Sequence, residues 1–584
     1  MSASAERWDR PAALAVWAVW AAMLLGGLLF IHRFASNVPS WDDWDMVPTL
    51  TGVQPVTPEW LWSQHNEHRV PVPRLLYLAL NRLTVVDFRT TMYFDLATMA
   101  GLAAAMIVVA RRLRGRTSLT DVFFPLLLLH WGQAANLLWG WQLQFFVSVA
   151  LCCIALLAIT GSGTLLRPRT AGLTVGACAV LLTLCGANGL GPVPMLALWP
   201  LALAYLPSPW TGLEQRDRRA LVVVSVAALL LSALYFVGWQ AVPYHPKSHS
   251  IHQSLRTAVQ FLTIGLGPAS RDVWPVSGYA VILTLTLTAF MLAVVLWKQP
   301  DERPRATGLL CFLGAQASLA LGLSLGRDGF ETRYVTLAIP LWCCAYFAWT
   351  LYGPGARGAL VRGMLAVAAA AALWSNTAFG LDYAGKLRGQ LRAFELDMAA
   401  GVPVHELIYR YGPWLHPHQD IVADYLLLLR RANVGAYGKL REDPPFRAVP
   451  IKLDPLEQKQ LRFSDSTAQV VGPNPALLFG LPADRYVTGI RLTYQYRSDD
   501  GTLPYIGVRW KPSSQTEFVP ERYYKYSPTG DRANWERGGW TRLQDPGTTL
   551  TIWICDTVRQ LGITPDFRPA VFRITELSLL EPLE

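Results

Sequence analysis

The sequence predicts a polytopic α-helical membrane protein that carries a C-terminal β-sandwich or jelly-roll domain outside the membrane. The 584 residues are 52% hydrophobic and only 16% charged, whereas soluble proteins carry about a quarter charged residues. Apolar runs long enough to cross a bilayer recur as far as residue 381. After residue 450, short β-prone runs alternate with Gly, Pro, Asn and Asp clusters, as in antiparallel β domains.

We expect about eleven membrane spans, each an apolar run of about 17–25 residues. The segment 73–88 is apolar but short and is interrupted by Asn81 and Arg82, so we expect an interfacial or re-entrant helix there. The first span lacks a small-residue cleavage site, which indicates a retained helix. The expected spans are 12–31, 92–110, 119–138, 141–160, 171–187, 190–206, 220–240, 275–297, 308–326, 335–352 and 363–381.

Lysine and arginine residues predict the orientation. With a cytoplasmic N-terminus, the basic clusters of the short connections all fall on the cytoplasmic side, as the positive-inside rule requires. An odd number of spans then places the C-terminal domain outside the cytoplasmic (inner) membrane. The net charge of +10 follows from this topology and does not indicate nucleic-acid binding. The clusters are Arg111/Arg112/Arg114/Arg116, Arg167/Arg169, Arg216/Arg218/Arg219, Lys298/Arg303/Arg305 and Arg357/Arg362.

The composition divides the chain into three expected domains. Residues 1–384 form the transmembrane domain, 385–449 a helical or irregular connector, and 450–584 the β-sandwich, which is large enough for a core of its own. Seven of the eight cysteines lie in apolar segments. Their spacing predicts neither a zinc site nor a disulfide framework.

Three aspartates open the first outer loop. Asp42, Asp43 and Asp45 alternate with Trp41 and Trp44. One carboxylate can take the proton of an acceptor hydroxyl, and a second can raise the pKa of the first, orient the acceptor, or hold a divalent cation such as Mg²⁺ or Mn²⁺. The alternative is a solvated loop that caps a helix. Tryptophans that favour the membrane–water interface and carboxylates beside apolar spans favour the functional reading.

The same loop closes with a run of five polar residues. The His-x-x-His spacing lacks the order of a zinc-binding helix, and Pro71 and Pro73 argue against a helix there. We expect the arginine and the imidazoles to contact a phosphate or sugar hydroxyls; the alternative is interfacial capping without a ligand. The run is His65, Asn66, Glu67, His68 and Arg69.

A third polar group is the turn 326–334, which holds Arg327, Arg333 and Tyr334. An arginine at the mouth of a helix can reach a lipid-linked phosphate at headgroup depth; the alternative is a capping turn with an internal ion pair. The loop 241–274, which includes Arg271, either closes over a donor or is a plain connection. Six further residues either line a sugar cleft or form an aromatic belt, namely Gln133, Asn136, Trp139, Trp141, Gln142 and Gln144.

The sequence has no GxxxxGK[ST] loop, no GxGxxG after a strand, and no GxSxG elbow. It also predicts no soluble cytoplasmic domain that would bind a nucleotide sugar. A donor used on the outer face would therefore arrive attached to lipid.

The chain resembles the GT-C superfamily of membrane glycosyltransferases in its expected topology, in Trp41-Asp42-Asp43-Trp44 of the first outer loop, and in Arg333-Tyr334. The resemblance implies an inverting transfer of a sugar from a polyprenyl-phosphate carrier, with Asp42 or Asp43 as general base. Some relatives bind a divalent metal, here through Asp42 and Asp43, and others do not. The β-rich tail resembles the carbohydrate-binding modules of some arabinosyl- and mannosyltransferases of cell-wall assembly.

We therefore expect a glycosyltransferase that joins a sugar from a polyprenyl-phosphate donor to a glycan or other acceptor outside the membrane. One alternative is a transporter or flippase of a lipid-linked saccharide. The spans are poor in polar residues apart from Asn188 and Gln316, which counts against it. The other alternative, a non-catalytic glycan-binding membrane protein, leaves the carboxylate loop unexplained.

Overall fold

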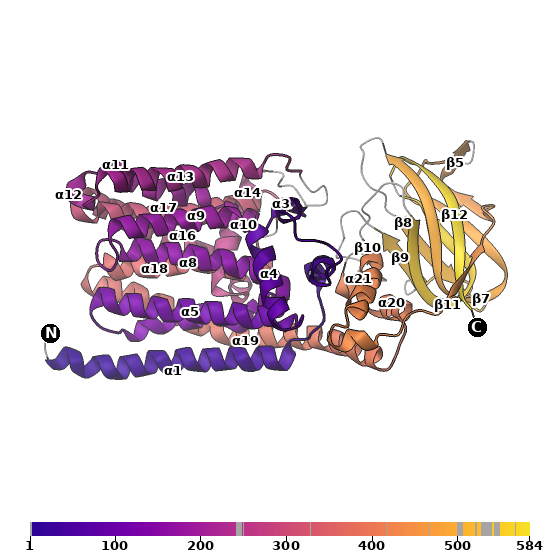
Figure 1. Cartoon of the computed structure of the whole chain (residues 1–584), viewed down its shortest axis with the longest axis horizontal. Helices are drawn as coiled ribbons and strands as arrows, with labels where there is room; N and C mark the ends of the chain where they lie inside the picture. Colours follow the sequence, from indigo (N-terminus) through magenta and orange to yellow (C-terminus); the bar gives the residue numbers. More distant parts are fainter. Residues whose placement is uncertain are drawn as a thin grey trace. The chain divides into compact units, whose positions relative to one another are not determined.

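A computed structural model describes residues 3–240, 248, 250–327, 329–416, 419–464, 467–498, 506–519, 522–526, 540–541, 549–566 and 568–583. The chain forms two compact units (Figure 1). Within the described residues, the first comprises 3–37, 56–240 and 248–388, and the second comprises Val38–Pro55 and the part from Gly389 onward. The expected domain boundaries at 384 and 449 stay predictions. Residues 241–247 and 249 of the expected outer loop lie outside the described residues.

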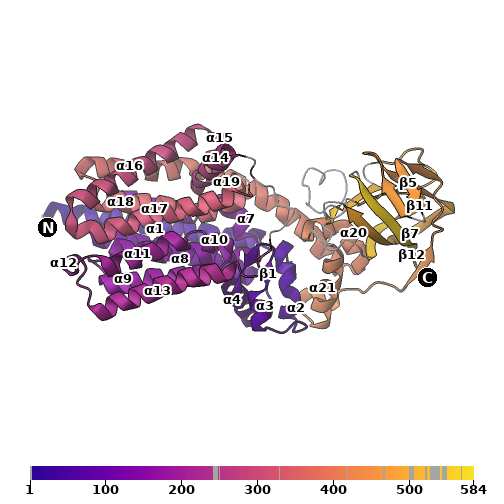
Figure 2. The ribbon, with the colours of Figure 1, turned by 90° about the horizontal axis from the view of Figure 1, so that it is seen from above.

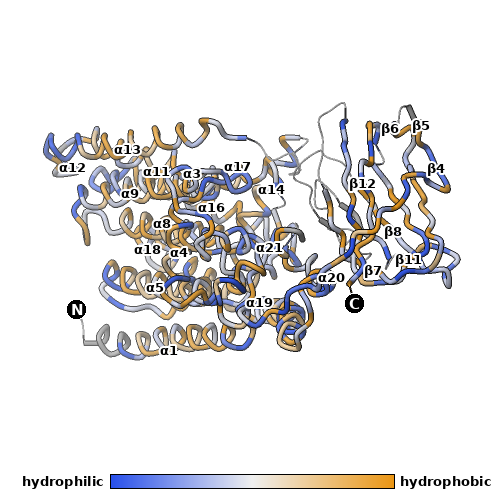
Figure 3. The backbone as a smooth tube through the Cα atoms, turned by 45° about the vertical axis from the view of Figure 1, so that its right-hand side comes forward, coloured by the Kyte–Doolittle hydropathy of each residue, from blue (hydrophilic) through white to orange (hydrophobic). Residues whose placement is uncertain are grey.

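The first unit is a bundle of apolar helices, and this confirms the expected helical membrane protein. Among the described residues, nine helical segments are long and apolar enough to cross a membrane. Apolar residues dominate these helices (Figure 3). The orientation and the total of eleven spans stay predictions. The nine segments contain α1 (Ala3–Phe34), α5 (Arg89–Arg114), α8 (Leu143–Gly161), α10 and α11 (Ala187–Leu190 and Val193–Tyr205), α13 (Gln215–Tyr235), α16 (Val276–Lys298), α17 (Arg303–Ser324), α18 (Val335–Leu351) and α19 (Gly355–Ala399).

The expected span 119–138 is not one continuous helix, and whether it crosses the membrane stays a prediction. It consists of η2 (Leu119–Val122), α6 (Phe123–Leu128), η3 (Trp131–Gln133) and α7 (Ala134–Leu137). The broken segment runs antiparallel to α18, because Thr120 Oγ1 lies 2.7 Å from the Tyr346 hydroxyl while Asn136 lies 2.7 Å from Thr336 Oγ1. At the break, Gln133 Nε2 donates to the Leu128 carbonyl. A side-chain bond thus satisfies a group that helix continuation would otherwise have paired.

The expected span 171–187 corresponds to α9 (Pro168–Thr183), which has 16 residues. It packs beside α8, α11 and α13, and Figure 2 shows α9, α11 and α13 side by side. Its connection to α10 passes through Gly186 at φ +92°, a left-handed conformation that glycine adopts without a steric penalty.

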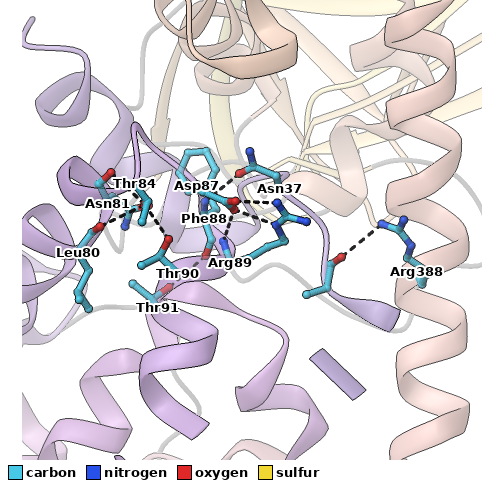
Figure 4. A network of polar contacts seen from close by, with 11 residues as sticks. Asn37, Leu80, Asn81, Thr84, Asp87, Phe88, Arg89, Thr90, Thr91 and Arg388 are labelled. Carbon is cyan, nitrogen blue, oxygen red and sulfur yellow. Dashed lines mark hydrogen bonds and ion pairs between the residues drawn. The ribbon is translucent and has the colours of Figure 1, made fainter. Parts of the chain in front are cut away.

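The expected short helix at 73–88 is α4 (Pro71–Leu83). It begins with proline at its first position, where no helical N–H is needed. The turn after it is tied to the start of α5 (Figure 4): Thr84 Oγ1 lies 2.7 Å from Thr90 Oγ1, and the Phe88 N–H donates to Asn37 Oδ1 at 2.8 Å. Leu83 is 81% exposed. The interfacial position of α4 stays a prediction.

Short elements complete the first unit between its long helices. They are α3 (Pro58–Trp62), β1 (Gln64–His65), β2 (His68–Arg69), η4 (Gly140–Gln142), α12 (Ser208–Thr211), α14 (Ile251–Thr263), η5 (Ile264–Leu266), α15 (Ala269–Asp272), η6 (Pro300–Glu302) and η7 (Thr332–Tyr334). Tyr334 is buried between the rings of Phe145 and Phe261, so its side chain belongs to the core of this unit.

The second unit joins the first outer loop to the C-terminal part of the chain. The loop forms η1 (Trp41–Met46) and α2 (Val47–Leu50), and both pack against α21 (Gln419–Arg431). Trp44 and Val47 are fully buried and anchor these short helices. The unit also contains α20 (Val404–Leu415) and η8 (Gly435–Lys439).

The C-terminal β-sheet that the sequence predicts is present. In the described residues the sheet has ten strands, and its main path runs β10-β9-β8-β11-β7-β12-β6-β5. The long strands β7, β11 and β12 pair antiparallel, with Ile490 opposite Ile552 and Leu579. These three residues are buried in the domain core. The jelly-roll form and the binding of glycan stay predictions.

The strands of the domain are β3 (Phe446–Pro450), β4 (Glu457–Lys459), β5 (Leu461–Ser464), β6 (Thr467–Val470), β7 (Ala476–Ser498), β8 (Ile506–Lys511), β9 (Tyr523–Tyr526), β10 (Trp540–Thr541), β11 (Thr549–Thr564) and β12 (Ala570–Pro582).

Candidate functional site

The three aspartates of the first outer loop have different surroundings. Ser40 precedes η1 with extended backbone, and its N–H donates to Asp43 Oδ2 at 3.1 Å. The two residues form a capping box, in which side chain and main chain satisfy each other at the helix start. Asp43 is fully buried. Its carboxylate therefore stabilises the local fold.

Asp42 and Asp45 form a pair on the same short helix. They are three residues apart, and in a 3₁₀-helix side chains at this spacing eclipse one another. Their carboxylate oxygens lie within 4.8 Å of each other, and both side chains are half-buried. Asp42 and Asp45, rather than the sequence neighbours Asp42 and Asp43, are thus the carboxylates that stand together.

A histidine from the C-terminal part of the chain lies beside this pair. His416 Nε2 is 3.9 Å from Asp45 Oδ1, and the His416 side chain is only 5% exposed. Burial raises the pKa of Tyr425, and the negative charges of Asp45 and Asp424 raise it further. Burial also raises the pKa of Asp424, although the charge of Arg431 opposes this. No sequence pattern indicated that His416 would lie beside Asp45, because a His-Pro-His run (416–418) does not identify a distant partner.

The five-residue polar run forms a β-hairpin whose arginine is used within the fold. Gln64 pairs with Arg69, and His65 with His68. The Arg69 guanidinium donates to the carbonyls of Trp62, Tyr235 and Val237 at 2.6–2.9 Å. The bonds to Tyr235 and Val237 cap the C-terminus of α13, and the bond to Trp62 caps the C-terminus of α3. The expected contact of Arg69 with phosphate stays a prediction.

The tip of the hairpin carries a small charge cluster. Glu67 forms an ion pair with Arg327. His68 Nδ1 accepts the Ala187 N–H at 3.1 Å, and its Nε2 lies 3.4 Å from Glu67 Oε1. Since Nδ1 accepts, the neutral imidazole carries its proton on Nε2, toward Glu67. The cluster joins the hairpin to α10 and to the end of α17. The ring of His65 packs against Trp141.

Arg333 lies in η7, at the start of α18. Its Nε is 3.5 Å from Glu331 Oε1, and its guanidinium carbon lies 5.8 Å from the ring centre of Trp139. The Arg333 side chain is 30% exposed. A guanidinium that is partly exposed and held over an indole face can still bind an anion. Arg271, another candidate cation, is exposed on α15.

The residues Trp139 and Trp141 are at most 8% exposed. Because they are buried within the protein, they do not form a lipid-facing aromatic belt. Gln142 and Gln144 are also buried, and their side-chain oxygens accept no hydrogen bond from the described residues. Whether this group contacts sugar stays a prediction.

Each unit therefore gathers part of the predicted set. In the first unit Glu67, His68 and Arg327 lie together, and Arg333 lies over Trp139. In the second unit Asp42 and Asp45 lie together beside His416. The convergence of aspartates and arginines on one cavity stays a prediction.

No family model matches the chain, and no curated protein matches its sequence. Among solved structures, the chain is similar to the cryo-EM structure of the arabinosyltransferase EmbB from Mycobacterium smegmatis, with 10% identity and a TM-score of 0.25. The match covers 97% of this chain and 64% of that chain, so the chain spans less than two thirds of its length. A similarity at this level establishes neither a family nor a function.

Proposed function

We propose that the protein is a membrane glycosyltransferase that moves a sugar from a polyprenyl-phosphate carrier to a hydroxyl group of a glycan acceptor outside the cytoplasmic membrane. The observation that carries the proposal is the paired, half-buried carboxylates of Asp42 and Asp45, which follow the first apolar helix. Carboxylates beside membrane spans have a functional role more often than a structural one.

Asp42 is the proposed general base. Asp43 is fully buried and holds the start of η1 through Ser40, whereas Asp42 is half-buried and has Asp45 as its neighbour. A second carboxylate raises the proton affinity of the first. Asp42 therefore takes the hydroxyl proton of the acceptor while Asp45 orients the acceptor.

The reaction that we propose is a single displacement. The acceptor oxygen forms a bond to the anomeric carbon as the bond from that carbon to the phosphate oxygen breaks. The bonding electrons leave with the polyprenyl phosphate, which gains one negative charge, and the acceptor proton goes to Asp42. Attack from the face opposite the phosphate inverts the anomeric configuration.

Arg333 is the proposed partner of the departing phosphate, and Arg327 is a second candidate. A fixed cation aimed at developing charge stabilises the transition state. The Arg333 side chain is 30% exposed, whereas Arg69 is 6% exposed and its guanidinium donates to three carbonyls.

A divalent cation such as Mg²⁺ or Mn²⁺ fits the acidic pair, because both ions prefer carboxylate oxygens. Asp42 and Asp45 would hold it, since Asp43 is engaged with Ser40. The cation would supply positive charge near the phosphate. A chelator titration of the purified protein, with back-addition of each ion, measures whether transfer depends on a metal.

The test of the proposal is sugar transfer by purified protein in liposomes. Radiolabelled polyprenyl-phosphate pentoses and hexoses are offered with cell-wall glycans, and labelled glycan is measured. We expect D42N to lower kcat about 10²–10⁴-fold, the usual contribution of a general base, and D45N to have a smaller effect. D43N should lower thermal stability more than it lowers the rate per folded molecule.

The matched control is E457Q, which removes an exposed carboxylate on β4 and should leave the rate unchanged. Full activity in D42N would remove Asp42 from the mechanism. An absence of sugar transfer, together with movement of the labelled lipid between leaflets, would favour the flippase alternative. Glycan binding without either activity would favour the non-catalytic one.

A further inference from the structure

The short helix α7 lies beside the start of α18 and binds the main-chain carbonyl of Arg333. Asn136 is fully buried, and its Nδ2 donates to the Arg333 carbonyl and to Thr336 Oγ1, both at 2.7 Å. These bonds hold Arg333 in η7 and Thr336 in the first turn of α18 against α7. The position of the Arg333 Cα atom thus depends on a residue almost two hundred positions earlier in the sequence.

A second pair of bonds extends this connection. Thr336 Oγ1 donates to Gln133 Oε1 at 2.8 Å, and Gln133 Nε2 donates to the Leu128 carbonyl at 2.9 Å. Gln133, Asn136 and Thr336 are at most 1% exposed. Water does not compete for these groups, so each bond is strong and the loss of one partner leaves a buried polar group unpaired.

The same segment also sets the direction of the Arg333 side chain. Trp139 follows Asn136 by three residues, and the Arg333 guanidinium lies over its ring at 5.8 Å. Glu331 approaches Arg333 Nε at 3.5 Å. One short stretch of chain therefore holds the main chain of Arg333 through Asn136 and orients its charged end through Trp139.

This arrangement accounts for the interrupted helix at 119–138. A continuous helix would pair its own main-chain groups, whereas the observed break lets the Gln133 amide bond both Leu128 and Thr336. Interruptions inside a membrane bundle are tolerated where side chains satisfy the main-chain groups that they release. The Gln133 side chain is thus paired through both its amide nitrogen and its oxygen.

We propose that Gln133, Asn136 and Thr336 are positioning residues that hold Arg333 against the phosphate of the lipid carrier. The inference rests on the proposed function of Arg333 in sugar transfer. None of the three contacts the phosphate; they act through Arg333. A displacement of about 1 Å in a group that acts on the transition state costs about 10²-fold in rate.

The experiment compares T336V with T336S. Valine keeps the shape of threonine but removes the hydroxyl that joins Asn136 to Gln133, whereas serine keeps the hydroxyl. We expect T336V to lower kcat about 10–100-fold with little change in the KM for acceptor, and T336S to stay within about twofold of the wild type. In the R333A background, T336V should have no further effect.

The control for the substitution itself is T160V. Thr160 is fully buried on α8, and its hydroxyl donates to the Leu156 carbonyl of its own helix at 2.7 Å. T160V should leave the rate unchanged. If T336V does not fold, as judged by thermal unfolding in detergent, Q133M breaks the same chain of bonds one residue farther from Arg333 and takes its place in the comparison.

A binding measurement separates this inference from the proposed function. Undecaprenyl phosphate is titrated into the protein, with undecaprenol as the control that lacks phosphate. We expect T336V and R333A each to weaken binding of the phosphate, and the double variant to bind no more weakly than R333A. Equal losses from T336V with and without Arg333 would show a purely structural role and overturn the inference. An absence of phosphate-dependent binding to the wild type would overturn it as well. If the wild type transfers no sugar but the binding pattern holds, only the proposed reaction fails.

Discussion

The hairpin 64–69 and the turn 331–334 each contain an arginine among other charged residues, but the two arginines have different hydrogen-bond partners and different exposure. Arg69 is buried and donates to three main-chain carbonyls. Arg333 is held through its carbonyl, its guanidinium lies near Glu331 and over the ring of Trp139, and its side chain is 30% exposed. In the hairpin the main-chain carbonyls accept from the charged group of Arg69, whereas in the turn the Arg333 side chain lies beside Glu331 and Trp139 and is partly exposed.

The comparison gives a rule for choosing among polar candidates. A charged group whose hydrogen bonds are made to main-chain carbonyls stabilises the fold, because its loss leaves those carbonyls unpaired. A charged residue that is held through its main chain and has a partly exposed side chain is the better candidate for binding a ligand. Asp43 and Asp42 differ in the same way as Arg69 and Arg333, since Asp43 accepts the Ser40 N–H and is fully buried while Asp42 is half-buried.

The largest effect that we expect is from R333A. Loss of a donor to developing charge lowers kcat about 10²–10³-fold, and because the side chain is partly exposed, the midpoint of thermal unfolding should change by little. R333K keeps the charge but not the paired N–H groups, so it should restore only part of the rate. Transfer rate and thermal unfolding are measured on the same preparations.

The control for R333A is R392A, which removes an exposed guanidinium paired with Glu395. It should match the wild type in rate and stability. If R333A transfers sugar at the wild-type rate, the distinction between the two arginines has no bearing on catalysis.

The second-largest effect that we expect is from R69Q, and it falls on stability rather than on the transfer rate. Three carbonyls lose a charged donor within a buried site, so we expect a loss of about 3 kcal/mol in the free energy of unfolding. The rate per folded molecule should stay close to that of the wild type. A stable R69Q protein with a much higher KM for donor would contradict the structural role and favour phosphate binding by Arg69.

The smallest effect is from E67Q, at the tip of the hairpin. The Glu67 and Arg327 side chains are 15% and 26% exposed, and a partly exposed ion pair contributes about 1 kcal/mol or less. We expect a small fall in the unfolding midpoint that shrinks as salt is added, since salt screens exposed charges. A loss as large as that of R69Q would mean that the whole hairpin, and not Arg69 alone, supports the fold.

Hydrophobicity alone was enough to predict much of the fold. Long apolar runs gave the helical bundle, and alternating β-prone runs gave the C-terminal sheet. The break inside 119–138 was missed because its cause is not local: Asn136 and Gln133 form hydrogen bonds with Thr336 on α18. The hydrophobicity of a segment indicates that it is buried, but it does not indicate which distant residues its polar side chains bind.

The candidate site could be predicted only by residue type. The spacing of three aspartates did not show that Asp43 would cap η1, because a 3₁₀-helix there is set by Ser40 and by the buried Trp44. Nor did the sequence separate Arg69 from Arg333, since the carbonyls of Tyr235 and Val237 that Arg69 meets lie at the end of a distant helix. His416 belongs to a short His-Pro-His run (416–418), and this spacing does not show that it would lie beside Asp45.

The packing of η1 on α21 has a consequence for the order in which the protein is made. A ribosome releases the acidic helix early, but the surface against which it packs, and His416 beside Asp45, are synthesised only after the last long apolar helix. The nascent chain therefore carries its carboxylates for most of translation without their final surroundings. Chains that terminate before residue 404 would insert in the membrane yet lack this part of the fold.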